Sequence, residues 1–376
     1  MPIIRRAAPL LACLLTLTFA HAAPAVHGRV DTIGDAPNPI TVLHLWGTPY
    51  ERGFAHGKLC APQVKQLIER LALGACIAMR CTPEKLDEAW GQMAPFVPQR
   101  YLDEMRGLAD GAGVSLRHVQ WAHAIPDLSE FHCTFFAAWG KATRGGHLQQ
   151  IRALDYATQA GLQDHPALIV EKTGAGQVFV NIGWVGFLGC VSGMNLSHIA
   201  VSEIGEHFGD EHETLAGEPM PFLLRDVLEN ARTLDQGVKI IQRAHRTSSY
   251  LYCVGDGKIP SARALRTAKD ICEVYDADSY PGERLEDVVY WSMGCDSKWN
   301  KRVYEALKPH WGRVYHRTGT RDIMRELGTG NLHAVAYDVT ALKLWVANAS
   351  PGPKVEPGHQ RRFVPFDLKR AAAQLP

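Results

Sequence analysis

The chain of 376 residues is 46% hydrophobic and 21% charged, and 40 Lys and Arg nearly balance 39 Asp and Glu. This composition is typical of a globular protein with a large core, and it excludes a disordered, collagen-like or coiled-coil chain. A net charge of +1 offers no basic surface for nucleic acid. Nine cysteines are too few for a miniature disulfide scaffold.

The first 22 residues have the pattern of a secretory signal. Arg5 and Arg6 precede an apolar run over 7–20, and small residues lead up to Ala22, after which we expect cleavage. A lipoprotein signal ending at Cys13 is the alternative, but only six uncharged residues separate Arg6 from Cys13. The run is too short to span a membrane, and no later segment has 18 successive apolar residues. The sequence therefore predicts a periplasmic or secreted protein without a spanning segment.

Hydrophobic periodicity divides the rest of the chain into a helical part and a mixed part. Apolar residues recur at three- and four-residue spacing between positions 49 and 126, which predicts helices that end at Pro126. Two amphipathic helices are expected at 219–232 and 234–246. Short strand-like runs cover 133–139, 148–156, 167–171, 178–182, 189–194, 199–204, 250–255, 270–275, 332–337 and 343–348. Consecutive strands with segregated helices predict an α+β layered fold.

The eight cysteines that remain after removal of a signal leave several pairings open. Cys76 and Cys81 are close enough in sequence to close a small loop. Cys253 and Cys272 lie on strands expected to be neighbours, so that they can face each other. The alternative is that most cysteines are small buried apolar residues. A structural zinc site is not expected, because the chain contains no C-x-x-C pair.

The residues that point most clearly to chemistry lie around position 133. Cys133 opens a predicted strand, and Arg152 and Asp155 lie about twenty residues later on the next one. A hairpin would bring a thiol, a guanidinium and a carboxylate to one strand end. Asn195, after Gly193 and Met194, can supply a neutral donor to an oxyanion. Each residue alone also has an ordinary structural explanation, so that only their combination favours catalysis.

These residues, in this order, resemble the penicillin acyltransferase (C45-type) branch of the N-terminal-nucleophile hydrolases. The resemblance covers nearly the whole chain after the signal. It includes Gly47-Thr48-Pro49-Tyr50-Glu51-Arg52-Gly53, then Cys133-Thr134, Arg152, Asp155 and Gly193-Met194-Asn195, and further on Ser248-Ser249 and Asn331-Leu332-His333. It implies a four-layer αββα sandwich with a helical N-terminal segment. It also implies a division into 1–22 (signal), 23–132 (helical pro-segment) and 133–376 (catalytic core).

The resemblance further implies a self-processing enzyme in which Cys133 breaks the His132–Cys133 bond and its freed α-amine then acts as base for the thiol. Arg152 would lower the thiol pKa, Asp155 would orient the amine, and Asn195 would stabilise the oxyanion. The two chains would stay associated, and the substrate would be a small N-acyl compound, hydrolysed or used for acyl transfer.

Thr134, Ser248, Ser249 and Asn331 are expected in supporting roles. The sequence departs from the family where His132 replaces a small residue before the nucleophile, and where hydroxyls at 248–249 replace an Asn.

Two other functions stay open at this point. One is an N-acyl-lipid amidase of the same superfamily, and the other is a periplasmic binding protein that has lost catalysis. His207, Asp210, Glu211, His212 and Glu213 are ligand types for a metal, but their spacing fits no common zinc motif. We therefore expect a solvated loop there, and neither a metal nor a cofactor.

Overall fold

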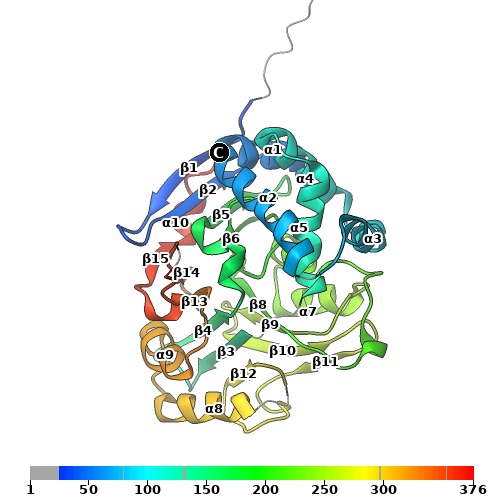
Figure 1. Cartoon of the computed structure of the whole chain (residues 1–376). Helices are drawn as coiled ribbons and strands as arrows, with labels where there is room; N and C mark the ends of the chain where they lie inside the picture. Colours follow the sequence, from blue (N-terminus) through cyan, green and yellow to red (C-terminus); the bar gives the residue numbers. More distant parts are fainter. Residues whose placement is uncertain (1–24, 79, 130–132, 296–297, 353) are drawn as a thin grey trace, which may run out of the picture.

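The structure is a computed structural model that describes residues 25–78, 80–129, 133–295, 298–352 and 354–376. The signal segment and His132 lie outside these described residues. Five helices follow the first two strands and lie together at one end of the molecule, while α8 and α9 lie at the opposite end (Figure 1). The helices are α1 (Pro49–Leu59), α2 (Ala61–Ala78), α3 (Pro83–Met93), α4 (Gln99–Ala112), α5 (Leu116–Leu128), α6 (Met220–Asn230), α7 (Leu234–Arg243), α8 (Lys298–Leu307), α9 (Met324–Leu327) and α10 (Leu368–Ala372).

Two mostly antiparallel sheets form the centre. The nine-stranded sheet has the order β1 (Gly28–Ile33), β2 (Ile40–Leu45), β5 (Pro166–Lys172), β6 (Val178–Trp184), β7 (Ser192–Asn195), β8 (Ile199–Gly205), β9 (Tyr250–Asp256), β10 (Ser261–Thr267) and β11 (Cys272–Tyr275). The six-stranded sheet has the order β12 (Val288–Ser292), β3 (Cys133–Gly140), β4 (Gly146–Leu154), β13 (His333–Asp338), β14 (Lys343–Asn348) and β15 (Val364–Asp367). The α+β class predicted from the sequence is confirmed.

The two sheets contact each other through β3 and β4 of one and β8 and β9 of the other. Helices α6 and α7 pack on the nine-stranded sheet, and α8 packs on β12. Strands β3, β8 and β9 are buried along almost their whole length, so that both of their faces are covered. This explains why their sequences are apolar runs rather than alternating patterns.

The segment before Cys133 is not purely helical, which corrects the sequence prediction. Strands β1 and β2 precede the helices, and β2 pairs in parallel with β5, with Leu43 opposite Ile169. Parallel pairing joins strands that are distant in the chain, so that local patterns gave no sign of it. Leu43, Ile169 and helices α1, α2, α4 and α5 share one apolar core, which spans both sides of position 133.

Helices α1 and α4 cross at very close range. A Cβ atom on Gly53 would lie 2.0 Å from Glu104 O, and one on Gly107 would lie 2.1 Å from Tyr50 O. Gly57 and Gly111 are similarly tight against the opposite backbone. Both helices therefore carry glycines four residues apart because side chains there would force the helices apart.

A buried network of ion pairs also joins the part before Cys133 to the part after it. Arg52 donates to Glu171 (2.8 Å) and to Glu104 (3.1 Å). Arg225 donates to the same two carboxylates, at 2.7 Å and 2.8 Å, and to Glu229 at 3.1 Å. All five side chains are at most 6% exposed. Each charge is paired several times, and it is this pairing that makes burial of charges tolerable.

Neither of the two cysteine pairings that the sequence left open is formed in this structure. Cys253 and Cys272 are not on neighbouring strands, because β10 lies between β9 and β11. Cys76 and Cys81 are near each other, with the Cys81 N–H donating to Cys76 O at 3.1 Å, but both are free thiols in this structure.

Candidate active site

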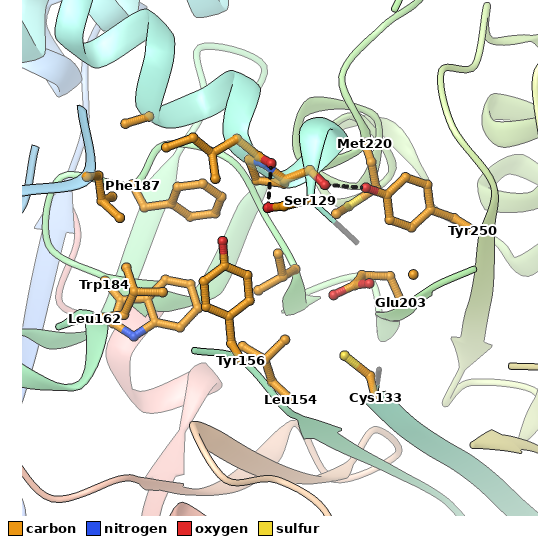
Figure 2. Close-up of a pocket in the computed structure, with 16 residues that line it drawn as sticks. Ser129, Cys133, Leu154, Tyr156, Leu162, Trp184, Phe187, Glu203, Met220 and Tyr250 are labelled. Carbon is orange, nitrogen blue, oxygen red and sulfur yellow. Dashed lines mark hydrogen bonds between the residues drawn. The ribbon is translucent and has the colours of Figure 1, made fainter. Parts of the chain in front are cut away.

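The predicted hairpin places Cys133 beside the end of β4. Strands β3 and β4 pair with Cys133 opposite Leu154 and Phe135 opposite Arg152. Cys133 is 1% exposed, and its thiol points from the end of β3 into a cavity whose other wall carries the Glu203 carboxylate (Figure 2). The hairpin therefore presents one thiol to the cavity.

Arg152 links the thiol to two buried partners. Its Nη2 donates to Cys133 Sγ at 3.4 Å and also forms an ion pair with Glu203. Its Nη1 donates to His333 Nε2 at 3.4 Å, and the Ser192 hydroxyl donates to the same ring nitrogen at 3.0 Å. A ring nitrogen that accepts two hydrogen bonds carries no proton, so that His333 is neutral. It therefore accepts a hydrogen bond from the guanidinium and adds no positive charge beside it.

The environment of the thiol disfavours its ionisation. Burial raises the pKa of Cys133 well above its ordinary value; the Arg152 guanidinium opposes this effect, and the Glu203 carboxylate adds to it. Burial likewise raises the pKa of Glu203. The cavity thus holds a neutral thiol beside a paired guanidinium, and attack on a carbonyl needs a base within reach.

Asp155 is held at the same end of β4 with one oxygen engaged. Its Oδ1 accepts the backbone N–H groups of Gly330 and Asn331, both at 2.8 Å. Its Oδ2 is buried and has no hydrogen-bond partner among the described residues. Asn331 fixes the adjoining chain, since its side chain accepts from Tyr156 N (2.8 Å) and donates to Tyr156 O (3.1 Å). A buried carboxylate oxygen without a donor is a place for a cationic or N–H group.

The structure does not bring Asn195 to the thiol, which corrects the expectation of an oxyanion donor. Its Nδ2 donates to Leu228 O (2.9 Å) and Ala231 O (3.0 Å), and its Oδ1 accepts from Ile199 N (3.0 Å). Both amide hydrogens are therefore used to hold the end of α6. Asn195 is absent from the cavity lining.

The three hydroxyl residues expected to support the site are also engaged elsewhere. Thr134 forms a 2.6 Å hydrogen bond with Ser292 on the neighbouring strand β12. Ser248 donates to Asp127 O at 3.4 Å, and Ser249 donates to the Glu213 carboxylate. None of the three lines the cavity. His132, the other half of the predicted cleavage bond, lies outside the described residues.

Glu203 and Ser192 were missed by the sequence reasoning, and His333 was only quoted as part of a motif. Glu203 is a charged residue inside the apolar strand β8 and is 4% exposed, and this is the signal that could have singled it out. Ser192 and His333 carry no comparable signal, because His333 contacts Arg152 and Ser192 contacts His333 from strands that are distant in the sequence and belong to different sheets.

The cavity at Cys133 is almost entirely apolar and encloses about 600 Å³ of space free of protein atoms, part of it open to solvent. Parts of the chain on both sides of position 133 build it. Besides Cys133 and Glu203 it is lined by Leu71, Ala122, Ile125, Pro126, Ser129, Leu154, Tyr156, Leu162, Trp184, Phe187, Val191, Gly205, Met220 and Tyr250. Such a lining suits an apolar group placed next to the sulfur.

Neither a metal site nor a membrane-spanning helix is found in the part of the chain that the structure describes. Within these ranges, no three His, Cys, Asp or Glu side chains are grouped so that they can hold a metal ion. Among the described residues, no helix is both long and apolar enough to cross a bilayer.

Comparisons with known proteins give distant similarities. No family model matches the chain. Protein dcd1B of Dictyostelium discoideum is 27% identical over 397 residues, covering 94% of this chain and 79% of that protein. Among solved structures, the Caenorhabditis elegans N-acylethanolamine-hydrolyzing acid amidase ortholog has a TM-score of 0.45 and 16% identity over 55% of this chain and 93% of its own. Penicillin V acylase from Agrobacterium tumefaciens has a TM-score of 0.39 and 10% identity over 58% of this chain and 84% of its own.

Proposed function

We propose that the protein is an exported, self-processing amidohydrolase or acyltransferase that cleaves a C–N amide bond through an acyl-enzyme on Cys133. The observation that carries this proposal is the Cys133 thiol in an apolar cavity, with its Sγ 3.4 Å from Arg152 Nη2. The carboxylate of Asp155, which follows the register partner of Cys133, has one oxygen without a hydrogen-bond partner among the described residues. In a binding protein without catalysis, nothing would require a buried guanidinium to contact the thiol.

The proposal accounts for the missing base. Cleavage between His132 and Cys133 would create an α-amine with an ordinary pKa near ~8, which can exchange a proton with a thiol at neutral pH. Asp155 follows Leu154, the register partner of Cys133, and its Oδ2 has no hydrogen-bond partner among the described residues; both observations support a role beside the new chain end. The carboxylate would hold the α-ammonium there.

Catalysis would proceed in two acyl-transfer steps. The α-amine takes the thiol proton, and Sγ forms a bond to the substrate carbonyl carbon. The C–N bond then breaks, and the leaving amine takes the proton from the α-ammonium. Water, activated by the same amine, adds to the thioester and restores the thiol with release of a carboxylic acid; an amine or alcohol in place of water gives acyl transfer.

The acyl group in this proposal is apolar, because the lining of the cavity offers few polar partners. An N-acyl-lipid amidase is the second candidate, and the same apolar lining favours it. The two candidates differ in the acceptable size of the acyl group and in the amine.

Processing would leave one fold made of two chains, 23–132 and 133–376, in the four-layer αββα arrangement. The β2–β5 pairing, the shared apolar core and the buried ion pairs of Arg52 and Arg225 all cross from one chain to the other. These contacts support lasting association after cleavage. Residues 1–22 would be removed on export.

Intact mass analysis after expression tests the proposal. The purified protein should consist of two fragments joined at 132/133, and Cys133→Ala should remain one chain. Cys133→Ser is the matched control, because it keeps a weaker nucleophile and should be cut more slowly. Amine release from a panel of N-acyl amides should require the cut form. A wild-type chain that stays whole and releases no amine contradicts the proposal.

A further inference from the structure

Two buried histidines of the segment before Cys133 hold one short loop after it. His56 of α1 accepts the Gly186 N–H at Nε2, and His123 of α5 accepts the Leu188 N–H at Nε2, both at 2.8 Å. Both side chains are fully buried. The loop connects β6 to β7, and Gly186 has a φ of +88°, a left-handed conformation that suits glycine.

Both rings are neutral acceptors. Burial lowers the pKa of His56 to about 3 and that of His123 to about 4. The partners of His123 define its tautomer, since Nδ1–H donates to Val119 O at 2.7 Å and leaves Nε2 to accept. Loss of either ring would leave a buried backbone N–H without an acceptor, which disfavours the present loop conformation.

The held loop is one wall of the cavity at Cys133. Trp184, Phe187 and Val191 belong to it or flank it, and all three line the cavity. The His123 ring stacks on the Phe187 ring with centroids 5.1 Å apart and an interplanar angle of 5°. Phe187 in turn meets Trp184 edge-on at 5.9 Å (Figure 2). A shift of either histidine would therefore move the aromatic wall and leave the β3–β4 hairpin in place.

We propose that His56 and His123 are positioning residues that set the acyl-chain preference of the enzyme by holding the 184–191 loop. This inference rests on the proposed function. It gives the segment before Cys133 a lasting role in the active enzyme, because the aromatic wall of the cavity depends on its two rings. The histidines do not touch the sulfur, so that thiol chemistry is independent of them.

The test compares four variants of the full, processed protein. His56→Phe and His123→Phe keep a ring but remove the acceptor, and His123→Gln restores an acceptor. His44→Phe is the matched control, since His44 is also a buried histidine but lies on β2 against Asp31, away from the loop. Hydrogen exchange of the peptide over 183–190, kcat/KM for short, medium and long straight-chain N-acyl amides, and alkylation of Cys133 by iodoacetamide are measured for each.

The expected result is faster exchange over 183–190 and a change of about tenfold or more in the long-to-short ratio of kcat/KM in both Phe variants. His123→Gln should recover most of the ratio, and His44→Phe should match wild type. Cys133 should be alkylated at the wild-type rate in all four. A long-to-short ratio within about twofold of wild type despite faster exchange overturns the inference and leaves the proposed function intact.

If wild type releases no amine at all, the proposed function fails, and displacement of a bound fluorescent fatty acid by short and long carboxylates replaces the kinetic ratio. The inference then stands if the Phe variants alter chain-length preference in binding, and it falls if they do not.

Discussion

Replacing His123 by Gln should change how stability depends on pH. The folded His123 has a pKa of about 4, lowered by burial from the ordinary histidine value of 6.5. Below pH 6.5 the unfolded chain therefore binds a proton that the folded chain does not, and stability is lost as pH falls towards 4. At pH 5, about 1.5 units below the pKa of the unfolded chain, the free energy of unfolding is lower than at pH 8 by about 2 kcal/mol. At pH 4 it is lower by about 3 kcal/mol.

The Gln variant does not lose stability in this way, because glutamine takes up no proton when the chain unfolds. At pH 8 wild type should be more stable by about 1–2 kcal/mol, because the substitution removes the ring stack and weakens a buried hydrogen bond. At pH 5 the difference should shrink by about 2 kcal/mol and so vanish or reverse. Burial raises the pKa of Asp127 and of Glu218 to about 7, so that these carboxyl groups add stability as the pH falls. Both groups are present in wild type and in the variant, and their contributions cancel in the difference between the two proteins.

Urea unfolding between pH 8 and pH 5 measures this difference. Both proteins should carry Cys133→Ala, so that each is a single covalent chain. His56→Gln should show a change of the same sign, because burial lowers the pKa of His56 to about 3. A difference between wild type and variant that is the same at every pH would refute the assignment of His123 as a neutral buried acceptor.

Three further substitutions test other parts of the structure. Arg152→Gln should slow alkylation of Cys133 at neutral pH about tenfold or more, since the guanidinium stabilises the thiolate; an unchanged rate would contradict the contact. Arg225→Met should cost about 3–5 kcal/mol in urea unfolding, because the buried carboxylates of Glu104, Glu171 and Glu229 each lose one of their cationic partners; a neutral effect would show that the network is not formed. Gly107→Ala should lower stability by about 1–3 kcal/mol, because its Cβ would meet Tyr50 O at 2.1 Å; a stabilised protein would contradict the close helix crossing.

Much of the site's framework could be predicted because it is local. Cys133 and Arg152 lie on strands joined by a short turn, so that a strand signal on each side of a glycine pair is enough to predict their pairing. The helices between positions 49 and 126 were predictable for the same reason, since each buries a face at regular spacing.

The partners of these residues could not be predicted, because they come from distant parts of the chain. Glu203 reaches Arg152 across the contact between two sheets. Asn195 looked like an oxyanion donor from its place in a motif, but the packing of α6 against β7 engages its amide with two carbonyl groups. A side chain's role depends on which groups lie opposite it, and sequence spacing does not contain that information.

Hydrophobic periodicity and turn residues act over a few positions, and they were enough to establish the α+β class and to place a thiol, a guanidinium and a carboxylate around one hairpin. Long-range packing was needed to establish that β2 joins β5, that β10 separates β9 from β11, and that His56 and His123 hold the cavity wall. Such contacts form where buried polar groups must find partners, and those partners are chosen by the packing of the whole chain.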